Sequence, residues 1–144
     1  MITDAGFVGA KAALFCGGAL VTILRDTHPG LAWAGMWDLP GGGREGDETP
    51  ESCLLREVAE ELGLRLSPSC LTWQVELASM TDPARPSHFF AGTITRGDIA
   101  AISFGDEGQG WALMQVADFL NHSHAIPEMQ CRVRLALTAG AIPR

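Results

Sequence analysis

Residues 41–64, "GGGREGDETPESCLLREVAEELGL", contain more structural signals than any other stretch of the chain. Three glycines open the segment, and a predicted helix follows from Pro50 to Leu62. Thr49 is a suitable N-cap residue, and proline is favoured at the first helical position. Gly63 suits the residue that ends a helix, because glycine readily takes a left-handed conformation. The segment therefore predicts a glycine-rich flexible loop that leads directly into a well-bounded helix.

The predicted helix has an apolar face and an acidic ridge beside it. At 100° per residue, the apolar arc that we expect to face the core is formed by Leu54, Leu55, Val58 and Leu62. A second arc holds Glu57, Glu60 and Glu61, whose like charges repel by ~0.2–0.5 kcal/mol per pair. One interpretation is a solvated face on which Arg56 pairs with Glu60 at i, i+4. The other is a site for a divalent cation, which would offset the repulsion.

Features outside the helix favour the cation site. Glycines such as Gly41–Gly43 let the backbone approach a ligand closely, and Glu48 adds a fourth carboxylate at the start of the helix. Mg²⁺ prefers oxygen ligands and binds together with substrate phosphates. Neither the phosphate-binding motif GxxxxGK[ST] nor an EF-hand loop occurs in the sequence.

The same residues resemble the complete signature of a known family, the Nudix hydrolases. Gly42, Glu48 and the run from Arg56 to Leu64 fill each fixed position of the Nudix box. Asp47 is a small departure, since many members have glycine there. The resemblance implies a hydrolase that cleaves nucleoside diphosphates linked to another moiety and uses Mg²⁺ or Mn²⁺. It also implies an α+β fold, an αβα sandwich with a mixed β-sheet between helices.

The resemblance also implies roles for individual residues. Glu57, Glu60 and Glu61 would bind the metal, and Glu57 or a neighbour would help to deprotonate the attacking water. Arg56 would orient Glu57 through a charge-assisted hydrogen bond. The metal would receive a backbone carbonyl from Gly42, and Glu48 would act through waters. A metal in such a site neutralises the diphosphate and lowers the pKa of a bound water.

Two further candidates lie outside the box. The segment "GDEGQGW", residues 105–111, is either a polar turn or, by similarity to MutT-type members, a loop that supplies Glu107 to the metal or the water. Asp106 is the neighbouring alternative. Arg25, at the end of a predicted strand, is a candidate to bind a phosphate or a base, and a solvated strand end is the alternative. Trp33, Trp37, Phe89 and Phe90 could stack on a base, although a core position is favoured for most of them.

The rest of the chain predicts strands on both sides of the box. Two β-like stretches, 12–16 and 19–25, are separated by a glycine turn, and residues 70–80 and 88–96 are rich in strand-forming residues. A short strand follows the 105–111 turn, and residues 116–120 form a brief helix. A final helix begins at Pro127. At 144 residues, we expect one domain over residues 1–144.

Composition excludes several classes of function. The net charge is −7, with one lysine among ten basic residues, which disfavours binding to a nucleic-acid polymer. The longest apolar run, residues 12–24, is too short to span a membrane. Four scattered cysteines without a CxxC pair predict reduced thiols, hence a cytoplasmic protein. We expect a monomer or homodimer.

For substrate, the sequence favours a (deoxy)nucleoside triphosphate pyrophosphohydrolase. The alternatives are an ADP-ribose or nucleotide-sugar pyrophosphatase, or a non-catalytic nucleotide-binding module; such modules usually lose box glutamates, which are all present here. The chain has no tyrosine, which disfavours hydrolysis of diadenosine polyphosphates. No asparagine near residues 124–129 matches the residue with which MutT-type enzymes read an oxidised guanine, so that specificity is not expected.

Overall fold

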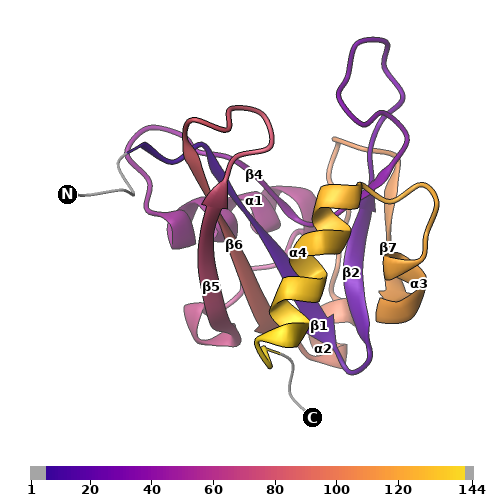
Figure 1. Cartoon of the computed structure of the whole chain (residues 1–144). Coiled ribbons are helices and arrows are strands. Elements are labelled where there is room, and N and C mark those ends of the chain that lie inside the picture. Colours follow the sequence, from indigo (N-terminus) through magenta and orange to yellow (C-terminus); the bar gives the residue numbers. More distant parts are fainter. Residues whose placement is uncertain (1–5, 142–144) are drawn as a thin grey trace.

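The computed structural model describes residues 6–141, in which four strands precede the first long helix and further strands and helices follow in mixed order (Figure 1). The strands are β1 (Gly9–Cys16), β2 (Ala19–Leu24), β3 (Trp37–Asp38), β4 (Gly41–Gly43), β5 (Leu71–Ala78), β6 (Pro86–Thr93) and β7 (Gly110–Gln115). The helices are α1 (Pro50–Leu62), α2 (Arg96–Ala100), α3 (Val116–Leu120) and α4 (Pro127–Thr138), with a 3₁₀ turn at Pro68–Cys70. No helix among these residues is long and apolar enough to cross a membrane.

The strands form one mixed sheet with β1 near its centre. Across the described residues the main order is β3-β2-β1-β6-β5, while β4 pairs with β1 and β7 pairs with β2. The β1–β6 pair is parallel, and the other pairs are antiparallel. Both strands of the parallel pair are largely buried, as expected when both faces of a sheet are covered.

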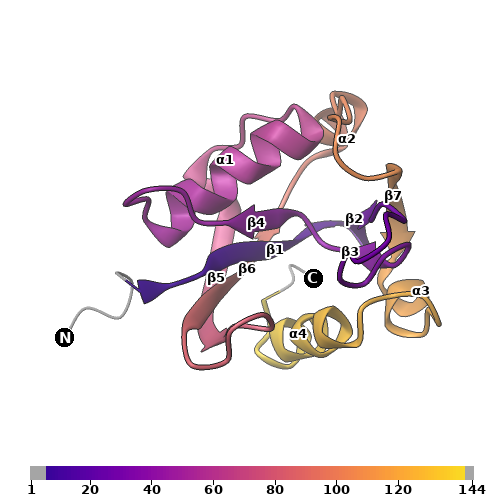
Figure 2. The ribbon, with the colours of Figure 1, turned by 90° about the horizontal axis from the view of Figure 1, so that it is seen from above.

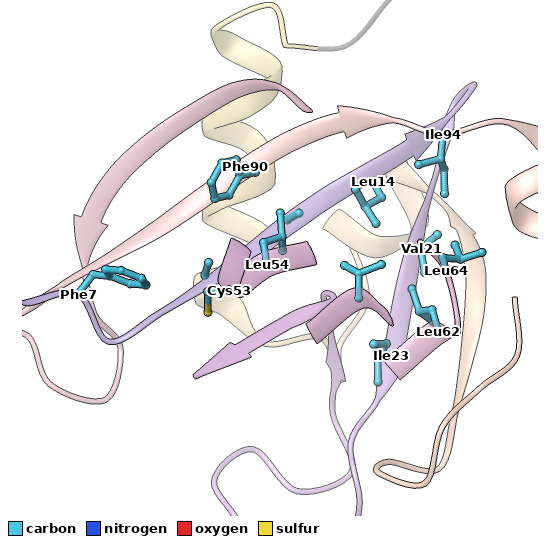
Figure 3. Packing of buried hydrophobic residues seen from close by; sticks show 13 residues of the cluster. Phe7, Leu14, Val21, Ile23, Cys53, Leu54, Leu62, Leu64, Phe90 and Ile94 are labelled. Carbon is cyan, nitrogen blue, oxygen red and sulfur yellow. The ribbon is translucent and has the colours of Figure 1, made fainter. Parts of the chain in front are cut away.

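Helices α1 and α4 cover opposite faces of this sheet (Figure 2). A core cluster on the α1 side joins Leu54 and Val58 to strand residues such as Leu14, and Figure 3 shows this packing. A second cluster joins Met129 and Val133 of α4 to the other face. The expected α+β sandwich, with a mixed sheet between helices, is confirmed.

Helix α1 begins and ends where the sequence predicts. The Thr49 side chain accepts a hydrogen bond from the backbone N–H of Ser52, and Ser52 bonds back to the Thr49 N–H. Gly63 closes the helix at φ 65°. The predicted core face is wrong at one position, because Leu55 is only half-buried, whereas Cys53 is fully buried. The buried arc is therefore rotated toward Cys53, which is four residues before Glu57 and eight before Glu61.

Two local predictions differ from the structure. The glycines of 41–43 form β4 and pair with Gly9–Lys11 of β1 instead of making a flexible loop. Residues 94–96 leave the predicted strand, and Thr95 instead caps the short helix α2. In both places long-range pairing or a local cap overrides strand and loop propensity.

Candidate active site

A cavity of about 740 Å³ lies beside β1, β4 and α1. Glu57 and Glu61 of α1 line it, together with the backbone of Gly41–Gly43. Glu60 is exposed and does not line it. The predicted ridge of three glutamates is thus divided, with two carboxylates turned inward and one turned to solvent. The two inward residues are spaced four apart and share one side of the helix.

Glu61 is the more deeply buried of the inward pair. Its Oε1 accepts a hydrogen bond from the Gly41 backbone N–H at 2.9 Å. Burial raises the pKa of Glu61 to about 7, against the opposing influence of the positive charge of Lys11. Burial disfavours the ionised form of Glu61, and a cation bound beside the carboxylate would stabilise that form.

Glu57 is held between a glycine and an arginine. A Cβ atom at Gly42 would lie 2.5 Å from the Glu57 carboxyl carbon, so a larger residue there would force this carboxylate to move. Arg56 Nη1 donates to Glu57 Oε2 at 3.0 Å. Burial raises the pKa of Glu57, while the hydrogen bond from Arg56 acts in the opposite direction. The side chain is therefore fixed in direction without being fully neutralised.

Arg56 links the start of α1 to its acidic residues. Its Nε donates to Glu48 Oε2 at 2.7 Å, and its Nη2 donates to the Gly43 carbonyl at 2.8 Å. The Glu60 carboxylate also receives a bond from Nη1, at 3.1 Å, which is the i, i+4 pair considered from the sequence. The bond from Arg56 lowers the pKa of Glu48. Glu48 therefore contacts Arg56 and positions its guanidinium.

A group of three charged residues lies in the cavity wall; Arg25 is a candidate from the sequence, whereas Lys11 and Asp38 were not identified from it. Buried Asp38 accepts hydrogen bonds through Oδ2 from Lys11 Nζ at 3.1 Å and Arg25 Nη1 at 3.2 Å. One carboxylate thus holds two cations, which leaves a net positive charge beside Glu61. The signal available in the sequence was the single lysine of the chain, at a strand position that is otherwise surrounded by apolar residues.

The predicted second acidic segment also reaches the cavity. Asp106 and Glu107 both line it. Their loop is fastened to the end of β2, because the Gly108 N–H donates to Asp26 Oδ2 at 3.0 Å and Gln109 Nε2 donates to the Arg25 carbonyl at 2.8 Å. This attachment places a carboxylate-bearing loop in the wall of the same cavity as Glu57.

The aromatic candidates fall into two groups. Phe89 and Phe90 are buried in the two core clusters, and Trp37 packs against one of them. Trp33 lines the cavity and has a left-handed backbone at φ 51°, which is uncommon for a bulky residue. Trp33 alone of these residues lines the cavity where a substrate ring could reach it.

The acidic residues have the oxygen ligands that a hard divalent cation prefers, although they are not arranged as a complete coordination site. Two inward carboxylates and a nearby backbone carbonyl are the oxygen donors that Mg²⁺ takes. In residues 6–141, no group of three or more Asp, Glu, His or Cys side chains is arranged to hold an ion. Recruiting Glu60 as a third carboxylate would require it to leave Arg56.

Comparison with known proteins identifies the family. The family model described as the NUDIX domain matches residues 11–131. The chain therefore belongs to the Nudix hydrolase family, as its box predicts.

Relatives with assigned names match over shorter stretches. An 8-oxo-dGTP diphosphatase of Proteus vulgaris is 49% identical over 37 residues, covering 26% of this chain and 33% of that protein. An RNA pyrophosphohydrolase of Acidiphilium cryptum is 42% identical over 52 residues, covering 36% of this chain and 32% of that protein. The match thus spans about a third of the length of each of these relatives.

Solved structures share the fold at low sequence identity. The MutT protein of Methanosarcina mazei Go1 has a TM-score of 0.73 at 18% identity, covering 99% of this chain and 100% of that one. A bifunctional NMN adenylyltransferase/ADP-ribose pyrophosphatase from Francisella tularensis, complexed with AMP and a manganese ion, has a TM-score of 0.76 at 17% identity. That match covers 94% of this chain and 42% of that one.

Proposed function

We propose that this protein is a metal-dependent pyrophosphohydrolase of small nucleotides, with (deoxy)nucleoside triphosphates as the favoured substrates. The observation that carries the proposal is the pair of inward carboxylates, Glu57 and Glu61, in one cavity wall with the glycine strand β4. In the reaction, a water oxygen attacks a phosphorus of the anhydride, the phosphorus–oxygen bond to the leaving phosphate breaks, and a carboxylate accepts the proton of the water.

Glu57 and Glu61 would hold Mg²⁺ or Mn²⁺, joined by the Gly42 carbonyl and by Glu60. The bound ion would neutralise the diphosphate and lower the pKa of a water. The bond that Arg56 donates would hold Glu57 in place, and the bonds of Glu48 would hold Arg56.

Other residues would act on the substrate. Glu107, or its neighbour Asp106, is a candidate to orient the water from the facing loop. Lys11 and Arg25, which share the charge of Asp38, are candidates to bind phosphate oxygens. Asp38 neutralises one of these two cations, so the group of Lys11, Asp38 and Arg25 carries a net positive charge that can attract an anionic substrate.

The test is hydrolysis of a panel of nucleotides in the presence of Mg²⁺, with products separated by chromatography. The panel contains the nucleoside triphosphates, ADP-ribose, a nucleotide sugar and an RNA oligonucleotide with a 5′-triphosphate. Release of a nucleoside monophosphate and pyrophosphate from triphosphates supports the proposal. Faster cleavage of ADP-ribose, the nucleotide sugar or RNA would replace the proposed substrate, and binding without cleavage would indicate a non-catalytic module.

Three accompanying predictions concern the whole protein. The cytoplasmic location, the monomeric or homodimeric state and the single domain over residues 1–144 stay predictions from the sequence. Light scattering coupled to size-exclusion chromatography measures the oligomeric state directly. A mass above that of two chains would contradict the predicted monomer or homodimer.

A further inference from the structure

Arg132 is a buried cation without a carboxylate partner among residues 6–141. It lies on α4 with only 4% of its surface exposed. Its Nη2 donates to the Ala78 carbonyl at 3.1 Å and to Ser87 Oγ at 3.3 Å, both of which are neutral acceptors. Within residues 6–141, Nε has no hydrogen-bond partner and the guanidinium forms no ion pair. A charged group that is buried in this way is costly unless an acceptor reaches it.

The surroundings of Arg132 do not supply that acceptor. Burial lowers the pKa of Arg132, and the carboxylates that oppose this effect, Glu128 and Asp38, act at a distance without a hydrogen bond. Asp38 is already bonded to Lys11 and Arg25. Both Nη2 bonds tie the guanidinium to the β5 and β6 side of the sheet, which fixes its orientation.

Arg132 lines the same cavity as Glu57 and Glu61. The cavity wall also includes the apolar residues Leu39 and Ile126, together with Met80. The carboxylates lie on α1 and the arginine on α4, and these helices cover opposite faces of the sheet (Figure 2). The cavity thus has a carboxylate wall suited to a metal-bound diphosphate, and elsewhere an arginine whose neighbours in the wall include the neutral polar side chains of Ser79, Thr81 and Ser87 beside the apolar ones. A region of apolar and neutral polar side chains with one fixed cationic donor suits the acceptor edge of a flat ring.

We infer that Arg132 determines base specificity by donating to the oxygen and nitrogen acceptors of a 6-oxopurine, so that guanine nucleotides are preferred over adenine nucleotides. The inference rests on the proposed nucleotide hydrolysis. Arginine has five N–H donors and no acceptor. Guanine presents O6 and N7 as neighbouring acceptors, whereas adenine presents a donating amino group at the first of these positions.

The test compares kcat/KM for GTP, ITP and ATP in the wild-type protein and in Arg132→Met. ITP has the same O6 and N7 as guanine but lacks the 2-amino group. We expect wild type to prefer GTP and ITP over ATP, and Arg132→Met to reduce that preference roughly 5- to 150-fold, as expected for loss of a discriminating side-chain contact to a base edge. Arg134→Met is the matched control, because Arg134 lies on the same helix but is exposed. It should leave the preference unchanged.

The preference is a ratio within one preparation, so it does not depend on the fraction of folded protein. Arg132→Lys, which keeps the charge but loses the planar fork, should retain part of the preference. Equal kcat/KM for GTP and ATP in wild type, or an unchanged ratio in Arg132→Met, would overturn the inference. ITP that behaves like ATP would also overturn it.

A binding measurement separates this inference from the proposed function. Calorimetry without metal should show tighter binding of GMP than of AMP to wild type and no difference in Arg132→Met. This result, combined with no hydrolysis of any nucleotide, would reject the proposed activity and support the role of Arg132. Equal binding of GMP and AMP to wild type would reject the role of Arg132 even if hydrolysis is observed.

Discussion

Helices α1 and α4 are similar in construction and differ in how their polar residues are satisfied. Each begins with proline, covers one face of the sheet and contributes ionisable side chains to the same cavity. On α1, the carboxylates of Glu57 and Glu61 are hydrogen-bonded to groups from the same short segment, residues 41–64. On α4, buried Arg132 donates only to neutral acceptors among residues 6–141. In the two proposals, a compact motif builds the reactive centre, and a single residue from a distant helix determines which base is preferred.

The largest expected difference between the helices concerns turnover. Glu57→Gln keeps the shape of the side chain and removes its charge, so kcat should fall roughly 10²–10⁴-fold, the range for loss of a general base. Glu128→Gln removes the same charge from an exposed position at the start of α4 and should leave kcat unchanged. Steady-state kinetics with the best nucleotide of the panel measures both. Glu107→Gln should lower kcat as well if its loop acts on the water.

Equal small losses of kcat in Glu57→Gln, Glu107→Gln and Glu128→Gln would indicate a general effect of net charge and no specific catalytic site on α1. Near-normal turnover in Glu57→Gln would reject the assignment of the reactive centre to α1.

The next difference concerns stability within α1. Leu54→Ala removes a fully buried side chain and should lower the free energy of unfolding by about 2–5 kcal/mol. Leu55→Ala, at a half-buried position, should cost well under half of that. Urea denaturation of both variants measures the two values. A larger loss at Leu55 than at Leu54 would show that the buried side of α1 has been assigned incorrectly.

A smaller difference concerns the response to metal. Mg²⁺ or Mn²⁺ at 100 times its dissociation constant should add about 2.7 kcal/mol to the stability of the folded protein. Glu61→Gln should remove most of this stabilisation, and Glu60→Gln should remove less, because Glu60 is exposed and already pairs with Arg56. Thermal unfolding with and without the metal measures the response. An unchanged response in both variants would contradict a metal site on α1.

The last expected effect is the pH dependence of the metal-free protein. The pKa of Glu61 is about 7 in the folded protein and near its ordinary 4.5 in the unfolded chain. The folded protein therefore binds more protons between these values, so its stability should fall as pH rises from about 4.5 to about 7. Glu61→Gln should flatten this part of the profile of Tm against pH, measured with EDTA present. A steeper profile in the variant would contradict the burial of Glu61.

The parts of the molecule that sequence alone predicts are those set by short-range interactions. The cap at Thr49, the end at Gly63 and the spacing of the box glutamates all lie within 15 residues, and they locate α1 and name the family. The prediction for Leu55 is wrong because leucine is more hydrophobic than cysteine, yet Cys53 is the buried residue. The buried arc of a helix depends on the surface against which it packs as much as on hydrophobicity.

The parts that sequence does not predict depend on contacts between distant segments. Asp38 meets Lys11 across 27 residues, and Arg132 meets Ser87 across 45. No local period marks such residues, because each stands alone in a stretch with another evident role. Arg132 is the clearest example of a residue that the sequence does not identify, since it is a buried cation on a helix whose other buried residues are apolar.

The close fit of Gly42 around Glu57 has a consequence for protein engineering. A single methyl group at position 42 would occupy the space of the carboxylate, whereas at position 43 the same group would meet nothing within 4 Å. Adjacent glycines of one short strand should therefore tolerate mutation very differently. Gly42→Ala should give an inactive protein that retains the nucleotide pocket. Gly43 is a position at which a reporter group could be attached at the rim of the cavity.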